Sequence, residues 1–175
     1  RDCDIIIDAE NSFTSDEFLV FLNSLKNTRL YMIENPFSGS VDDYIKLYSW
    51  LRSNNLRPLI AAGEPSPDQN IIRSMGSQRI INVFNHDIVN YGFTRWIALM
   101  NIVKIMGIKA SPRSEGLAIK TVYSAHLSGA LGNTATIENI PCISDDIDLS
   151  GYSIKNGKLI IPSEPGFGMK ILRKF

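Results

Sequence analysis

The stretch CDIIIDAEN, residues 3–11, decides how the chain is interpreted, because its run of isoleucines ends in the acid Asp8. Consecutive β-branched residues predict a strand buried on both faces, as in a parallel sheet that helices cover on each side. The question is why a buried strand should deliver a carboxylate at its carboxyl end. Taken alone, Asp8 could simply cap the helix that follows.

Strand and helix patterns alternate from this stretch to residue 138. Ser15 is the expected N-cap of the first helix. Strands are expected at 3–8, 29–34, 57–64, 79–87, 108–112 and 134–138, and helices at 15–26, 41–55, 67–76, 93–107 and 116–133. Strands that alternate with helices predict a parallel sheet, so the expected fold class is α/β.

Two further acids end the next two expected strands: Glu34 closes LYMIE and Glu64 closes PLIAAGE. Because the carboxyl ends of parallel strands meet at one edge, and neighbouring strands lie about 4.8 Å apart, we expect Asp8, Glu34 and Glu64 to converge. Three uncompensated carboxylates repel one another, and a hard divalent cation that prefers oxygen ligands, such as Mg²⁺, relieves that repulsion. Each acid alone could cap a helix or pair with an arginine, but their shared position favours a metal site.

The same edge is expected to carry Asp87, Arg113 and Glu138, which stand at the ends of NVFNHD, KASPR and TATIE, the fourth, fifth and sixth strand segments. Ionisable residues at successive strand ends are typical of the active sites of β/α barrels. An unrelated α/β binding domain, for example a flavodoxin-like sheet without a divalent metal, remains an alternative.

The composition argues against several kinds of partner. The 175 residues carry 18 basic and 18 acidic side chains, so the formal net charge is zero and no basic surface for nucleic acid is indicated. No apolar run approaches the roughly 20 residues that span a bilayer, and no signal peptide is visible. The cysteines Cys3 and Cys142 form no metal-binding pattern, and we interpret them as reduced thiols of a cytoplasmic protein.

The ordered set of strand ends resembles the enolase superfamily, most closely its mandelate racemase-type branch, which includes many acid-sugar dehydratases. The resemblance is carried by Asp8, Glu34 in IENP, Glu64 in AAGEP, Asp87 before YGFT, Arg113 in SPR, and Glu138 in IEN. It implies a modified TIM barrel that binds one Mg²⁺ through Asp8, Glu34 and Glu64. It also implies abstraction of the proton α to a carboxylate, with stabilisation of the enediolate.

This resemblance implies a small sugar acid as substrate, with dehydration as the expected reaction and racemisation or epimerisation as the alternative. It implies a homo-oligomer, whereas the expectation that neither nucleic acid nor a membrane is a partner comes from the composition. Glu138 is expected to donate a hydrogen bond to the enediolate. Glu10 is expected near the metal, as an outer ligand, a substrate contact or a solvated loop residue.

Arg113 departs from the family pattern, which usually has a histidine at this position, paired with the aspartate that matches Asp87. Arginine stays protonated and cannot act as a base, so it could pair with Asp87, clamp a substrate carboxylate or face solvent. A metal-binding homologue that has lost its base and is not catalytic is therefore a further alternative. His86 and His126 are expected to be structural, because His86 faces away from Asp87 and His126 lies in a helix pattern.

We therefore name Asp87, Arg113 and Glu138 as candidate catalytic residues, and Glu10, Arg113 and Glu138 as candidate substrate contacts. The tail continues differently from the rest of the chain, because Asn156 and Gly157 stand between two strand-like runs and predict a hairpin.

Six strands cannot close an eight-stranded barrel. In the family, two strands and a capping domain precede the strand that matches residues 3–8, and the second strand usually carries a lysine base. We therefore expect residues 1–139 to be strands 3 to 8 of a partial (β/α)8 barrel with the metal site. Residues 140–175 are expected to form a tail that packs toward a missing N-terminal region. The isolated chain should be unstable, because it exposes strand edges.

Overall fold

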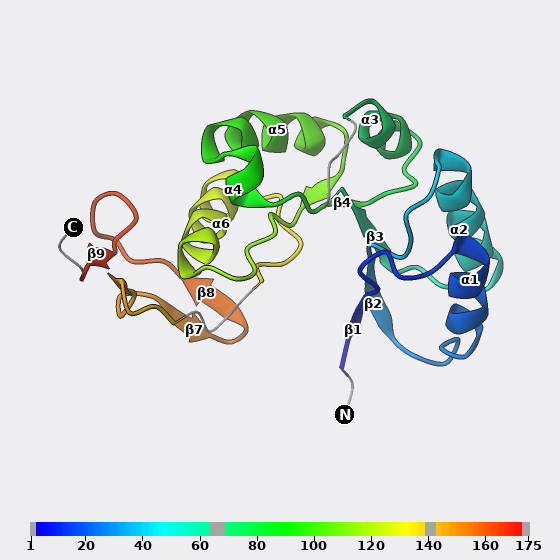
Figure 1. Ribbon diagram of the computed structural model, residues 1–175, viewed down its shortest axis with the longest axis horizontal. Helices are drawn as coiled ribbons and strands as arrows, with labels where there is room; N and C mark the ends of the chain where they lie inside the picture. The colour runs from blue at the N-terminus through cyan, green and yellow to red at the C-terminus, as the bar shows by residue number, and fades with distance from the viewer. Residues whose placement is uncertain (1–2, 64–68, 139–142, 173–175) are drawn as a thin grey trace.

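The main feature of the computed structural model, which describes residues 3–63, 69–138 and 143–172, is a curved parallel β-sheet (Figure 1). Its strands hydrogen-bond in the order β1-β2-β3-β4-β5. They are β1 (Ile5–Asp8), β2 (Leu30–Glu34), β3 (Leu59–Ala62), β4 (Val83–Phe84) and β5 (Lys109–Ala110). All four pairings are parallel, which confirms the α/β class predicted from the alternating pattern.

Helices connect these strands, and Figure 1 shows α1, α2, α3 and α5 along the outer side of the sheet. The helices are α1 (Ser15–Asn23), α2 (Val41–Ser53), α3 (Gln69–Ser77), α4 (Ile88–Tyr91), α5 (Phe93–Ile105) and α6 (Ala118–Leu131). The short helix α4 was not predicted. No helix among the described residues is long and apolar enough to cross a membrane.

The N-cap of α1 is Thr14, so the prediction of Ser15 is wrong by one residue. The Thr14 hydroxyl accepts a hydrogen bond from the Glu17 backbone N–H, and the Glu17 carboxylate accepts one from the Thr14 backbone N–H. This reciprocal pair satisfies two of the amide groups at the helix start. Ser15 instead donates its hydroxyl to Asp43 of α2, at 2.9 Å, and so links the first two helices.

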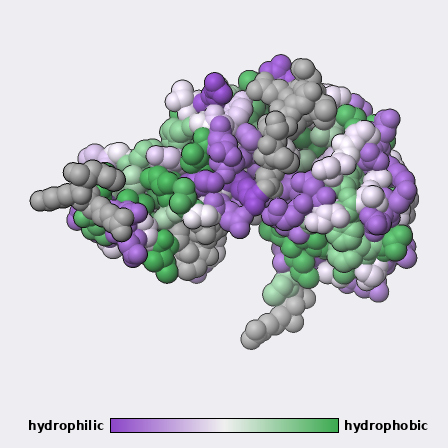
Figure 2. Space-filling view, in the orientation of Figure 1, coloured by the Kyte–Doolittle hydropathy of each residue, from purple (hydrophilic) through white to green (hydrophobic). Residues whose placement is uncertain are grey.

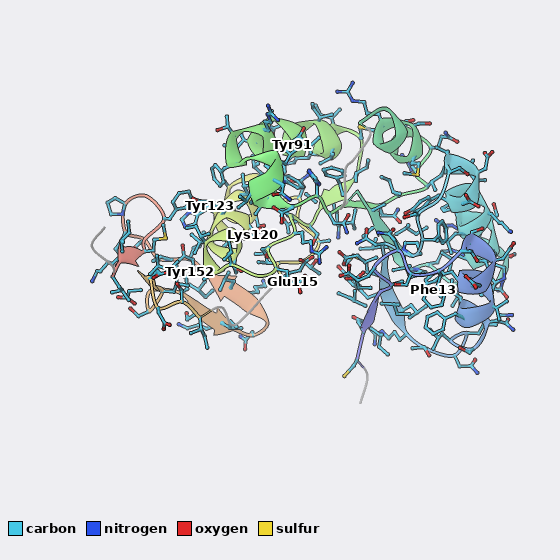
Figure 3. All side chains as sticks on the ribbon, viewed as in Figure 1. Phe13, Tyr91, Glu115, Lys120, Tyr123 and Tyr152 are labelled. Carbon is cyan, nitrogen blue, oxygen red and sulfur yellow. The ribbon has the colours of Figure 1, made fainter. Side chains whose placement is uncertain are left out.

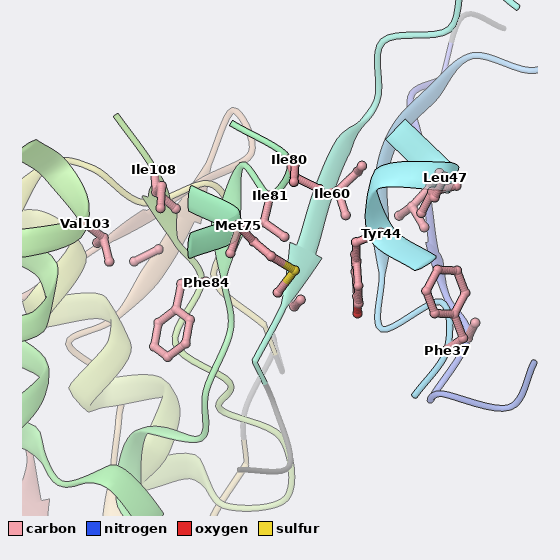
Figure 4. Packing of buried hydrophobic residues seen from close by; sticks show 14 of the residues in the cluster. Phe37, Tyr44, Leu47, Ile60, Met75, Ile80, Ile81, Phe84, Val103 and Ile108 are labelled. Carbon is pink, nitrogen blue, oxygen red and sulfur yellow. The ribbon is translucent and has the colours of Figure 1, made fainter. Parts of the chain in front are cut away.

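The hydrophobic core fills the space between the sheet and its outer helices (Figure 4). Strands β2, β3 and β4 are buried, as their continuous apolar sequences predict. Trp96 of α5 is fully buried. The close-up shows side chains of α2 on one side of β3 and Met75 of α3 beside it, together with Phe84 of β4.

Strand β1 is exposed, and the prediction that it is buried on both faces is wrong. Ile5 and Ile6 are 41% and 45% exposed. The reason is the position of β1 at the end of the sheet, where it pairs with β2 alone. Apolar side chains are therefore left in contact with water along one edge of the sheet.

The predicted sixth strand, at residues 134–138, is reduced to a single parallel bridge between Ala110 and Thr134. Backbone hydrogen bonds join Ala110 N–H to the Asn133 carbonyl and Ala135 N–H to the Ala110 carbonyl, each at 2.8 Å. The Ser111 hydroxyl binds the Thr136 carbonyl at 3.1 Å. The next bond of a longer parallel ladder would need an N–H at residue 112, and Pro112 has none.

The tail forms its own small antiparallel pairs. β6 (Ile147–Asp148) pairs with β9 (Lys170–Ile171), and β7 (Ser153–Lys155) pairs with β8 (Lys158–Ile160). The second pair is the predicted hairpin, and Asn156 and Gly157 both have positive φ, at 52° and 71°, as a tight hairpin turn requires. The boundary expected near residue 139 lies outside the described residues.

The tail contacts helices α5 and α6 through the ring of Phe167. Its centroid lies 4.9 Å from that of Tyr123, 5.0 Å from that of His126 and 5.5 Å from that of Phe93. Other apolar tail residues stay exposed, and hydrophobic surface is visible around β7 and β8 in Figure 2. Ile154 and Ile160 are 52% and 42% exposed, respectively.

Candidate active site

The ends of β1 and β2 place two acids side by side. Asp8 and Glu34 are the last residues of their strands, and the parallel register aligns the Cα atom of one with that of the other. This confirms that two of the three predicted acids share one edge of the sheet. The third, Glu64, lies outside the described residues, just beyond β3.

The other predicted residues follow the next strands. Asp87 comes after β4 and Arg113 after β5, and these two residues are joined by a parallel backbone bridge. Glu138 follows the bridge segment that replaces the sixth strand. A cavity of about 420 Å³ lies at this edge. The described residues that line it are Ile6, Asp8, Glu10, Met32, Glu34, Arg113, Glu115, Thr136, Ile137 and Glu138.

Glu34 is a buried carboxylate with one strong hydrogen bond. Its residue is 7% exposed, and Asn85 Nδ2 donates to its Oε1 at 2.7 Å. Burial raises the pKa of Glu34, and the charges of Asp8 and Glu10 add to that effect, while Asn85 and Arg113 oppose it. The carboxylate therefore stands in a place where a cation would stabilise its charged form.

Glu138 is the acid of the cavity whose pKa is shifted furthest from its ordinary value. Burial, followed by the charge of Glu34, raises its pKa to about 7, although the Ser114 backbone N–H and Arg113 favour the charged form. Ser114 N–H donates to Oε2 at 3.4 Å. The other oxygen, Oε1, is buried and has no hydrogen-bond partner among the described residues. Such an oxygen can donate to a ligand when it is protonated, or accept from one when it is not.

Arg113 forms ion pairs with two acids from different loops. Its Nη2 lies 2.5 Å from Glu115 Oε2 and 3.2 Å from Glu10 Oε1. Glu10 is therefore linked to Arg113 at the cavity. Its expected position near the metal stays a prediction. Neither of these ion pairs involves Asp87, so the interpretation of Arg113 as its ion-pair partner is wrong.

Asp87 pairs instead with Lys120 of α6, with 2.5 Å between Oδ2 and Nζ. Its other oxygen accepts the N–H groups of Val89 and Asn90 and caps α4. Burial raises the pKa of Asp87, but Lys120 and these amides outweigh burial and hold it below its ordinary value. Asp87 is thus tied to the scaffold at both oxygens.

Sequence reasoning missed Asn85, Glu115 and Lys120. A signal for Lys120 was present, because it is the one cation in the otherwise apolar and neutral helix 118–131. Both histidines are packed, as predicted. His86 is 8% exposed and its ring lies 5.3 Å from that of Tyr91, and His126 Nε2 lies 2.9 Å from the Tyr152 hydroxyl.

The described residues contain no group of three histidine, cysteine, aspartate or glutamate side chains that could hold a metal ion. The donors that they do supply fit a hard divalent cation. Asp8 and Glu34 are aligned in register, all donors are oxygens, and Glu138 presents a buried oxygen without a partner. The mutual repulsion of these carboxylates is the electrostatic situation that such an ion relieves.

Residues 1–174 match the family model described as enolase C-terminal domain-like. The chain belongs to this family. The resemblance to the enolase superfamily is thereby confirmed, and the parallel α/β sheet matches its barrel domain, although the five described strands form an open sheet.

Relatives in this family include several sugar-acid enzymes. Arabinonate dehydratase of Saccharolobus solfataricus is 26% identical over 175 residues, which is 98% of this chain and 46% of that protein. A crystal structure of galacturonate dehydratase from Geobacillus sp., complexed with D-galacturonate and 5-keto-4-deoxy-D-galacturonate, is 30% identical, with a TM-score of 0.90. The match covers 97% of this chain and 45% of that one.

A mandelate racemase/muconate lactonizing protein from Geobacillus sp. Y412MC10, crystallised with magnesium and tartrate, is also 30% identical. Its TM-score is 0.89, and the match covers 96% of this chain and 43% of that one. The chain therefore spans less than half the length of these relatives.

Proposed function

We propose that the protein containing this chain removes the proton α to the carboxylate of a sugar acid, in a Mg²⁺-dependent reaction that leads to dehydration. The observation that carries this proposal is the alignment of Asp8 with Glu34 beside the buried, unsatisfied oxygen of Glu138. The dehydratases among the relatives support the same reaction class. In this proposal, residues 1–139 are the barrel part and 140–175 a tail.

Asp8, Glu34 and Glu64 are the proposed ligands of the metal ion. A bound Mg²⁺ supplies Lewis-acid stabilisation of the negative charge that develops on a substrate carboxylate during proton abstraction. Asn85 orients one of these ligands, because its amide holds Glu34 Oε1 at 2.7 Å. Hydrogen bonds of this kind fix the direction in which a ligand presents its free oxygen.

Glu138 is the proposed acid of the site. In the metal-free protein, a pKa of about 7 leaves a large share of this carboxyl protonated at neutral pH. The protonated form can donate a hydrogen bond to the charge that builds up on the substrate, or a proton to a departing hydroxyl group. Arg113 and Glu10 are the proposed polar contacts to the substrate.

Dehydration fits this cavity better than racemisation. A racemase needs a base on each face of the α-carbon, whereas the described residues that line the cavity include neither histidine nor lysine. In this proposal a single base comes from outside the chain, and Asp87 caps α4 and links it to α6 through Lys120. The pairing of Asp87 with Lys120 also favours the second candidate function, a metal-binding homologue without catalysis.

A Mg²⁺-dependent screen of sugar acids on the intact protein separates the two candidates. We expect a 2-keto acid product for at least one acid, and exchange of the α-proton with deuterated water. Glu34→Gln should abolish both, and Asp16→Asn, on the exposed face of α1, should leave both unchanged. Mg²⁺ binding without turnover or exchange across a broad library would support the homologue without catalysis.

A further inference from the structure

Arg113 holds two carboxylates that water can reach. Its own side chain is 20% exposed, whereas those of Glu10 and Glu115 are 58% and 68% exposed. Ion pairs of this exposure contribute little net free energy, since water and salt compete for both partners. The guanidinium is therefore anchored at the cavity, while its ion pairs with Glu10 and Glu115 can be exchanged.

Arg113 is also the one cation among the described residues that line the cavity, whose ionisable residues are otherwise the acids Asp8, Glu10, Glu34, Glu115 and Glu138. An entering carboxylate would be repelled by these acids and attracted by Arg113. The planar guanidinium can bind one carboxylate through two parallel N–H···O hydrogen bonds. Single contacts to two separate acids do not give this paired geometry.

Lys120 provides a second positive charge near Glu115. Arg113 lowers the pKa of Glu115 by its hydrogen bond and charge, and Lys120 adds to this lowering from the start of α6. Figure 3 labels Lys120 on α6 and Glu115 in the same part of the molecule. A Glu115 carboxylate that leaves Arg113 therefore remains close to a cation.

We propose that Glu115 is a specificity-determining residue that occupies Arg113 in place of a substrate carboxylate, and that an acid substrate displaces it toward Lys120. The inference rests on the proposed function, because it assigns the role of substrate contact to Arg113. It implies that affinity depends on the carboxylate of the ligand. The affinity for a neutral polyol of the same carbon number should therefore not rise when Glu115 is lost.

Calorimetric titration of the intact protein tests this with tartrate as the acid and erythritol as its neutral four-carbon counterpart. Glu115→Gln should bind tartrate about fivefold more tightly than the wild type, since one competing exposed ion pair is lost. Asp16→Asn is the matched control, because it removes one acid from an ion pair with Lys46 on α2, and it should bind like the wild type.

The gain must depend on Arg113. In an Arg113→Gln background, Glu115→Gln should leave the affinity for tartrate unchanged. If Arg113→Gln does not fold, Arg113→Lys takes its place, because it keeps the charge but loses the planar guanidinium. In that background, Glu115→Gln should give a smaller gain in tartrate affinity than in the wild type. The inference is overturned if Glu115→Gln binds tartrate no more tightly, or if the gain persists without Arg113. An equal gain for erythritol contradicts it too.

The tartrate titrations are repeated with a chelator in place of Mg²⁺. In a separate experiment Mg²⁺ alone is titrated into the protein, so that metal binding and tartrate binding are measured independently. Absent Mg²⁺ binding counts against the proposed function, whereas an Arg113-dependent gain in the chelated protein still supports the role of Glu115. Conversely, normal Mg²⁺ binding with no effect of Glu115→Gln overturns the inference alone.

Discussion

Asp8 and Glu34 end adjacent parallel strands at aligned positions, so their carboxylates meet at one edge of the sheet. Glu34 is buried there, and its pKa is raised by burial and then by nearby acids despite a hydrogen bond from Asn85. Two aligned acids beside a third, Glu138, create an electrostatic demand for a cation. The proposed metal site depends on that demand.

The first prediction concerns Glu138 in the metal-free protein. Because its folded-state pKa is raised from 4.5 to about 7, the folded state binds more protons than the unfolded state in that window. Wild-type stability should therefore fall as the pH rises through it. Glu138→Gln removes this loss. The free energy of unfolding of the variant minus that of the wild type should therefore be up to about 3 kcal/mol larger at about pH 8 than at about pH 4.

Thermal unfolding of the intact protein with a chelator at the two pH values measures this difference. Glu164→Gln, which changes an exposed acid of the tail, is the matched control and should give no pH-dependent gain. A constant difference between Glu138→Gln and wild type at both pH values would show that the Glu138 pKa is not raised by folding.

The second prediction concerns the ion pair between Lys120 and Asp87. Both side chains are largely buried, at 17% and 11% exposure, so Lys120→Met leaves a carboxylate without its cation and should cost of the order of 3 kcal/mol. Because folding lowers the Asp87 pKa from its ordinary 3.8, this stability is present above that pH and is lost as the pH falls through the folded-state value.

Urea unfolding at neutral pH and below pH 3.8 checks both parts of that expectation. The deficit of Lys120→Met should narrow at the lower pH. Lys104→Met on α5 serves as the control, because it removes an exposed lysine whose Nζ donates to the Leu131 carbonyl and not to a carboxylate. An equal deficit at both pH values argues against the ion pair.

The third prediction concerns the start of α1. Thr14→Ala should destabilise the protein by about 1 kcal/mol, because it removes the hydroxyl that accepts the Glu17 N–H. Hydrogen exchange at the Glu17 amide should become faster in this variant. Ser15→Ala should leave that amide protected, since Ser15 binds Asp43 instead; faster exchange in Ser15→Ala alone would restore Ser15 as the cap.

The fourth prediction concerns the 175-residue chain expressed alone. Ile5 and Ile6 of β1 are exposed at an open sheet edge, and apolar tail residues are exposed as well. Such edges favour aggregation and contribute little to stability. We expect no cooperative thermal transition in circular dichroism, and a sharp transition at high temperature would contradict this expectation.

Much of the fold was readable from the sequence, because parallel strands carry continuous apolar runs and end in recognisable acids. The positions of Asp8 and Glu34 followed directly from that pattern. The exposure of β1 was not predictable from three isoleucines, since burial depends on what lies beside a strand. The shortening of the sixth strand had a signal in Pro112, which has no N–H to donate to the next acceptor of a parallel ladder.

The ion pairs of the site were harder to predict than its acids. Strand ends fix where Asp87 and Arg113 leave the sheet, but not which way their side chains turn. Lys120 reaches Asp87 from a helix 33 residues further along the chain. Partner choice of this kind depends on three-dimensional packing, which periodicity in the sequence does not encode.

The most direct test of the central claim is calorimetric titration of Mg²⁺ into the intact protein and its Glu34→Gln variant. We predict one Mg²⁺ site in the wild type, with affinity reduced at least about tenfold in Glu34→Gln through loss of a ligand charge, and unchanged in Asp16→Asn. Equal Mg²⁺ affinity in wild type and Glu34→Gln, or no Mg²⁺ binding by the wild type, would contradict the account.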